Sequence, residues 1–134
     1  MGGLTLVAGN LYGTAQLSDP GLGLAYELAN TASGWKEFEY TFTGRDGANP
    51  SSGLLRDSSG HFDGVAGSTF TCGVVFRFTR KGHSVSETVL YNFAGGSDGC
   101  GPNGPLVQDP SGNLYGVTLA GGTYNKGIAF EITR

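Results

Sequence analysis

The sequence predicts an all-β protein built from repeated units, and three observations lead to that prediction. Glycine and proline are abundant, with 25 and 5 of the 134 residues, whereas charged residues make up only 14 %. Such a composition is typical of a chain that is rich in turns and poor in helix. Hydrophobic residues reach 38 %, which argues against disorder. The third observation is a pattern of about fifty residues that recurs along the chain.

The first block of this repeat joins two short apolar segments through a glycine turn. It lies at residues 53–64 and recurs at 105–116. A third copy, without the Asp and with one residue deleted, lies within residues 3–14. Apolar residues alternate on either side of the turn, which is the period of a β-strand. Each copy of the block therefore predicts two strands.

The second and third blocks alternate apolar and polar residues in the same way. The second block lies at 23–28, 73–78 and 127–132, and the third lies at 38–42 and 89–93. Each copy of the third block leads into a loop that contains Asp-Gly. One unit therefore predicts four strands, and the last unit ends before its fourth strand.

Four short antiparallel strands per unit are typical of a β-propeller blade. The units are approximately residues 3–52, 53–103 and 104–134, which predicts three blades in a single domain, 1–134. Propellers need about four to eight blades to close a ring. Three blades leave two possibilities, a fragment of a longer array or a homodimer that completes a six-bladed ring, and we expect the homodimer. A β-trefoil is the alternative, because three units of this length also fit that fold.

Charge and the two cysteines restrict the partners and the chemistry. The net charge is −3 and the eight Lys and Arg residues are scattered, so we expect no nucleic-acid partner. No apolar run is long enough to cross a bilayer, and the chain does not open with a signal-peptide pattern. Cys72 and Cys100 permit one disulfide and do not require it.

The middle unit departs from the repeat at two positions that could carry chemistry. Where the flanking units read Asn-Leu-Tyr-Gly, it reads His61-Phe62-Asp63-Gly64. His61 and Asp63 would lie on one strand face, where an imidazole can act as a base beside an orienting carboxylate. Drift at an exposed turn is the alternative interpretation.

Other conspicuous side chains have structural interpretations. Asp57 and Asp109 precede a turn glycine by three residues, where a carboxylate accepts backbone N–H bonds. His83 lies in a polar segment and is expected to be a solvated loop residue. Aromatic residues at equivalent positions are expected to pack between blades. They are Tyr12 and Tyr115, Phe76 and Phe130, and Tyr40 and Tyr91.

Two acidic loops are candidate metal sites. The first loop follows residues 38–42 and supplies Asp46 and Asn49. The second loop follows residues 89–93 and supplies Asp98 and Asn103. In a propeller, such loops can approach the central mouth. Carboxylate and amide oxygens there suit Ca²⁺, which takes about six to eight oxygen ligands.

Four segments resemble a known repeat family. Residues 9–14, 88–93, 95–99 and 109–116 are similar to the Gloeo-Verruco (GloVer) tandem repeat of bacterial, often surface-associated proteins. This resemblance covers essentially the whole chain. It implies a propeller-like array and a secreted or cell-surface location, and it transfers no catalytic residue.

A more distant resemblance suggests an enzyme. The pattern Asp-x-x-Gly-Asn-Leu-Tyr at 109–115 resembles the blade motif of NHL-type propellers and of calcium-dependent gluconolactonase and paraoxonase-like hydrolases.

Two hypotheses follow. One is a calcium-dependent hydrolase of a small ester or lactone, in which the metal polarises the carbonyl while His61, oriented by Asp63, activates water. The other is a non-catalytic surface module that binds carbohydrate or protein.

Overall fold

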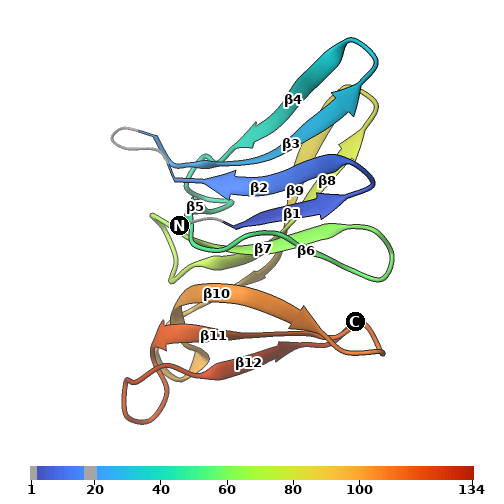
Figure 1. Cartoon of the computed structure of the whole chain (residues 1–134). Coiled ribbons are helices and arrows are strands. Elements are labelled where there is room, and N and C mark those ends of the chain that lie inside the picture. The colour runs from blue at the N-terminus through green and yellow to red at the C-terminus, as the bar shows by residue number, and fades with distance from the viewer. Residues whose placement is uncertain (1–2, 17–20) are drawn as a thin grey trace.

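A computed structural model describes residues 3–16 and 21–134, and these residues form three antiparallel sheets (Figure 1). Sheet 1 has the order β1 (Leu4–Val7), β2 (Asn10–Ala15), β3 (Leu24–Thr31) and β4 (Gly34–Thr41). Sheet 2 has the order β5 (Ala48–Pro50), β7 (Phe62–Gly67), β8 (Val74–Lys81) and β9 (Ser84–Asn92), and β6 (Leu55–Arg56) also pairs with β7. Sheet 3 consists of β10 (Cys100–Gln108), β11 (Leu114–Ala120) and β12 (Ala129–Ile132).

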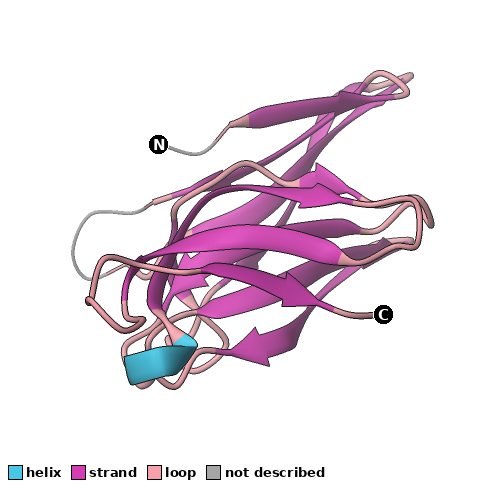
Figure 2. Ribbon diagram, turned by 90° about the horizontal axis from the view of Figure 1, so that it is seen from below, coloured by secondary structure: helices cyan, strands magenta, loops and turns pink. Residues whose placement is uncertain are grey.

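The predicted all-β class is confirmed. The helical structure in the described ranges is a single short 3₁₀ turn, η1 (Gly96–Asp98), shown in cyan in Figure 2. No helix among the described residues is long and apolar enough to span a membrane. The same residues form no closed ring.

The sheets change at different places from the approximate units read in the sequence. β5 lies within the expected first unit, yet it pairs with β7 of sheet 2. β5 and β6 together correspond to the single strand β10 of sheet 3. Residues 51–54 separate β5 from β6 and belong to neither strand. The sequence predicts a loop at the segment of β5, and the structure shows a short strand there.

Two hydrophobic clusters hold the three sheets in a stack. One cluster lies between sheets 1 and 2, and the other lies between sheets 2 and 3. Alternate residues of β8 serve both clusters, because Phe76 faces sheet 1 while Val75 faces sheet 3. Sheet 2 is therefore covered on both faces.

A glycine recurs at one position of the second strand of every sheet for a steric reason. Gly13, Gly64 and Gly116 lie directly opposite an aromatic residue of the next strand. At Gly64 a Cβ atom would lie 2.7 Å from Cζ of Phe76. The aromatic ring occupies the space that a side chain would need, so the Leu-Tyr-Gly pattern encodes a cross-strand contact.

Most of the repeated aromatic residues pack between sheets as predicted. Tyr12 stacks on Phe62 with ring centroids 3.8 Å apart, and Phe130 lies edge-on to Phe93. Two residues differ from the prediction. Tyr91 is 39 % exposed and bonds to Asp98 of its own loop, and Tyr115 lies on the face of sheet 3 that no further sheet covers.

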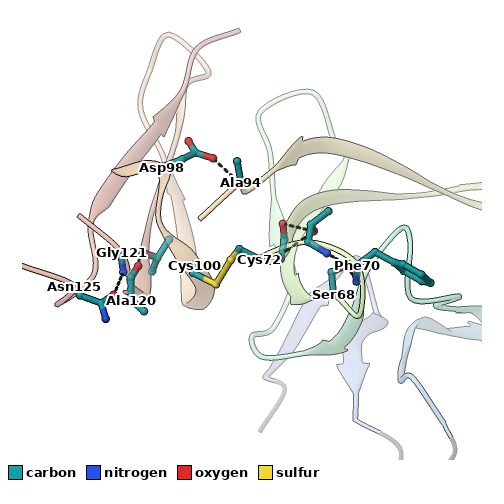
Figure 3. Close-up of a disulfide and its surroundings, with 12 residues drawn as sticks. Ser68, Phe70, Cys72, Ala94, Asp98, Cys100, Ala120, Gly121 and Asn125 are labelled. Atoms are coloured by element: carbon teal, nitrogen blue, oxygen red, sulfur yellow. Dashed lines mark hydrogen bonds between the residues drawn. A yellow bond between two sulfur atoms is a disulfide. The ribbon is translucent and has the colours of Figure 1, made fainter. Parts of the chain in front are cut away.

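The two cysteines form a disulfide that joins sheet 2 to sheet 3 (Figure 3). Cys72 lies in the loop before β8, and Cys100 begins β10. The backbone reinforces this junction, because the N–H of Gly101 donates to the carbonyl of Cys72 over 2.7 Å. The disulfide that the sequence only permitted is thus an inter-sheet cross-link.

Candidate functional site

The departure of the middle unit from the repeat creates an ion cluster rather than an isolated catalytic pair. Asp63 in β7 is fully buried, and its cross-strand partner in β8 is Arg77. Nε of Arg77 donates to Oδ1 of Asp63 over 2.8 Å, and Nη2 donates to Oδ2 over 3.0 Å. Nη2 also reaches Oδ2 of Asp57 over 2.7 Å.

Arg134 completes the cluster from sheet 3. Its Nη1 lies 3.0 Å from Oδ2 of Asp57, and its Nη2 lies 2.6 Å from Oδ2 of Asp63. Two carboxylates therefore face two guanidinium groups, and the charges balance. Burial raises the pKa of Asp63, and the contact with Arg77 opposes that rise. Replacing a single member of such a cluster should destabilise the fold, because it leaves a buried charge unpaired.

His61 is oriented by a different carboxylate from the one expected. Its Nδ1 lies 3.0 Å from Oδ2 of Asp57, while Asp63 is held by the two arginines. Burial alone would raise the pKa of Asp57, but the bonds from His61 and the charge of Arg77 bring it below its usual value. The imidazole is 40 % exposed. His61 thus keeps an orienting acid, and that acid is Asp57.

The turn function predicted for Asp57 and Asp109 is confirmed. Oδ1 of Asp57 accepts the backbone N–H groups of Ser59 and His61. Oδ1 of Asp109 accepts the N–H of Asn113 over 2.9 Å in the same way. His83 is exposed in the turn between β8 and β9, as expected.

A second ion pair joins sheets 1 and 2 at an equivalent place. Glu27 of β3 is buried, and its Oε1 accepts bonds from Asn10, Tyr12 and Arg80. Arg80 of β8 also donates Nε to Oε2, and its guanidinium lies 4.3 Å from the ring centroid of Phe38. Burial and the neighbouring Glu27 carboxylate raise the pKa of Tyr12. The pair lines a pocket of about 340 Å³ that also contains His61.

A compensating exchange explains why the middle unit differs from the repeat. Tyr12 is opposite Glu27 in sheet 1, and Tyr115 is opposite Glu131 in sheet 3. The same register in sheet 2 pairs Asp63 with Arg77. In sheet 2 the acidic residue stands at the position of the tyrosine, and an arginine stands at the position of the glutamate. Sequence analysis missed Glu27, Arg77, Arg80 and Arg134, although this paired exchange is visible in the aligned repeats.

The candidate calcium ligands are engaged within their own turns. Asp46 accepts bonds from the hydroxyl of Tyr40 and from the backbone and side chain of Thr43. Asp98 accepts the Tyr91 hydroxyl over 2.6 Å. It also accepts the Ala94 N–H over 2.7 Å, which Figure 3 shows. These bonds lower the pKa of Asp98, the contact with the Ala94 N–H most of all.

The surroundings of these loops give no support to a calcium site. Asn49 and Asn103 are exposed. In the part of the chain that the structure describes, no group of three or more His, Cys, Asp or Glu side chains could hold a metal ion. The donor set therefore does not fit a closed calcium site, and calcium binding stays a prediction.

A larger hollow lies where the first strands of the three sheets come together. Its volume is about 460 Å³, and it is lined by equivalent segments, 3–5, 51–55 and 104–106. The described residues that line it, 3–5, 51–55 and 104–106, include no charged side chain. The hydroxyl of Thr5 donates to the carbonyl of Leu54 over 2.6 Å, and that of Ser51 donates to Pro102 over 3.1 Å. These hydroxyl oxygens can still accept bonds from a ligand.

Stacked antiparallel sheets, equivalent inter-sheet ion pairs and a recurring glycine–aromatic contact define a tandem-repeat protein of the all-β class. The chain belongs to the Gloeobacter/Verrucomicrobia repeat family, whose model matches residues 1–134. Comparison with curated proteins and with solved structures finds no match. The resemblance to NHL, gluconolactonase and paraoxonase-like propellers gains no support from these comparisons.

Proposed function

We propose that this chain is a non-catalytic binding module, built as three propeller-like blades, that takes a neutral polar ligand in the hollow at its first strands. The observation that carries this proposal is the convergence of equivalent segments from all three repeats on one uncharged recess. Recesses with a few convergent polar groups are the usual binding sites of folded domains.

The lining restricts the chemistry of the ligand. A charged ligand would lose hydration without gaining an ionic partner among the described lining residues. Thr5 and Ser51 use their hydrogens on main-chain carbonyls and so offer acceptors. A ligand with many hydroxyl donors matches them, and Leu4 and Leu54 can pack against its apolar faces. We therefore propose a carbohydrate as the ligand of the hollow, with an extended protein segment as the alternative ligand.

A glycan array followed by titration calorimetry tests this proposal. Gly3→Leu should fill the hollow, because a Cβ atom at Gly3 is 3.7 Å from the nearest non-adjacent atom and meets no clash. We expect binding to weaken at least about tenfold, which corresponds to about 1.4 kcal/mol. Ala32→Leu, in the exposed turn between β3 and β4, is the matched control and should bind normally. Equal binding by both variants would refute the assignment to the hollow.

Hydrolysis of a small ester or lactone is the second candidate, and one observation favours it. His61 is half-exposed, lines the 340 Å³ pocket and is oriented by Asp57. A histidine held in this way can act as a general base. His61→Asn, the residue of the flanking units, should then lower hydrolysis by about a hundredfold and leave the fold intact. Assays with EDTA and with added Ca²⁺ test the calcium requirement separately.

A further inference from the structure

The outer face of sheet 3 is an uncovered copy of a face that is buried elsewhere in the chain. Its cross-strand register places Val107, Tyr115 and Glu131 in one row, with Val117 and Ala129 in the next. Val107 and Val117 are 59 % and 52 % exposed. The equivalent face of sheet 2 carries Val65, Val75 and Arg77 and is covered by sheet 3. Sheet 3 lies at the end of the stack (Figure 1).

The two covered faces share one kind of contact, an ion pair between an arginine and the carboxylates of the preceding sheet. Arg80 of sheet 2 reaches back to Glu27 of sheet 1, and Arg134 of sheet 3 reaches back to Asp63 and Asp57 of sheet 2. Arg80 lies three residues after Arg77, and Arg134 lies three residues after Glu131, so they occupy the same place in the repeat. Sheets 2 and 3 thus each contact the preceding sheet through one arginine that lies among acidic and polar side chains.

Sheet 3 carries the acidic partner of such an ion pair on its outer face. Asn113, Tyr115 and Glu131 repeat the set Asn10, Tyr12 and Glu27, in the same cross-strand register. The two asparagines have equivalent backbone contacts as well. Oδ1 of Asn10 accepts the N–H of Asn30, and Oδ1 of Asn113 accepts the N–H of Arg134. Glu27, which binds Arg80 in sheet 1, therefore has a counterpart in sheet 3, where Glu131 is exposed. The neighbouring Asn113 and Tyr115 side chains bond to Asp109 there, whereas Asn10 and Tyr12 bond to Glu27.

We propose that this face docks a further sheet of the same repeat type, whose arginine at the position of Arg80 pairs with Glu131. The exposed valines would cover the apolar part of that sheet, and Glu131 would select its arginine. This inference is independent of the ligand proposed for the hollow.

A second copy of this chain is a poorer occupant than a repeat with the arginine. Its sheet 1 carries Asn30 at the position of Arg80, so Glu131 would be covered without a cation. The outer face of sheet 1 also presents Glu39, opposite Tyr26, where sheet 2 has Val89 opposite Phe76. Docking of two copies would bring like charges together. Self-association of this chain through these faces should therefore be weak.

A donor and an acceptor version of the chain test the proposal. The acceptor is the natural chain, which has Glu131. The donor carries Asn30→Arg and Glu39→Val, which copy the pattern of sheet 2, and Glu131→Gln, which prevents self-docking. All three positions are exposed, so the fold should persist, and circular dichroism checks this. Sedimentation velocity of the mixture should show a one-to-one complex, while each protein alone stays monomeric.

Two controls isolate the ion pair. Replacing the acceptor by its Glu131→Gln variant should weaken the complex about tenfold, as should a donor with Asn30→Gln in place of Asn30→Arg. The proposal is overturned if folded donor and acceptor form no complex, or if either control binds as tightly as the full pair. Equally strong self-association of the natural chain would show that a second copy, without the arginine, is the occupant.

Discussion

Removing the Cys72–Cys100 disulfide should destabilise the protein substantially, because this bond closes a loop between two sheets. The cysteines are 28 residues apart. A cross-link of that span removes about 12 cal/mol/K of loop entropy from the unfolded chain, or about 3.5 kcal/mol at room temperature. With about 2.1 cal/mol/K of unfolding entropy per residue, Tm should fall by about 12 °C for 134 residues.

The assay is thermal unfolding followed by circular dichroism, with two ways of breaking the bond. Cys72→Ala with Cys100→Ala also removes packing, because Cys72 contacts the cluster between sheets 2 and 3. Reduction of the natural protein keeps both side chains and reports the cross-link alone. Both should lower Tm, the double variant slightly more. A Tm within about 2 °C of the parent after full reduction would refute the loop-entropy argument.

Three further predictions concern the stability contributions of Gly64, Arg80 and Glu87. Gly64→Ala should lower the free energy of unfolding by about 1–3 kcal/mol, because its Cβ would meet Phe76 and Leu54. Gly3→Ala is the control, because its Cβ makes only an ordinary 3.7 Å contact. Urea titrations that rank the two variants alike would contradict this prediction. Arg80→Met should cost about 2 kcal/mol by leaving Glu27 buried without its cation, and adding Glu27→Gln should recover most of the loss in the same titrations. Burial, helped by the charge of Asp46, raises the pKa of Glu87 to about 7. Its Oε1 is buried and has no hydrogen-bond partner among residues 3–16 and 21–134. The folded state therefore holds a proton that the unfolded state releases above its ordinary pKa of 4.5, so stability falls as pH rises from about 4.5 to about 7. Glu87→Gln should raise Tm at pH 8 and leave it unchanged at pH 4, and equal effects at both values would exclude Glu87 as the source.

The fold class was predictable because alternation of apolar residues is a local signal. The strands around Phe76 and Phe130 follow directly from it. The boundaries between sheets were not predictable in the same way. β5 has only three residues, one of them Pro50, and its place in sheet 2 depends on pairing with a strand beyond β6.

The candidate site was less accessible from sequence than the fold. His61 and Asp63 were selected as candidates because they depart from the repeat. The structure shows that Asp63 pairs with Arg77, which departs from the repeat on the opposite strand. Comparison of cross-strand positions between repeats would have found that exchange. Arg134 could not be placed by this means, since its contact with Asp63 spans two sheets and 71 residues. The hollow also depends on how three separate strands lie together.

The coverage of sheet 2 on both faces has a consequence for the dynamics of the whole stack. Val74, Val75 and Phe76 in β8 are fully buried, whereas sheets 1 and 3 each leave one face to solvent. In a linear array, each unit is stabilised by its neighbours, so the end units open more readily than the middle one. Backbone amides of β8 should exchange with deuterium only through global unfolding, whereas those of β1 and β12 should exchange through local fraying. Addition of a docked sheet beyond β12 would then slow exchange at that end first.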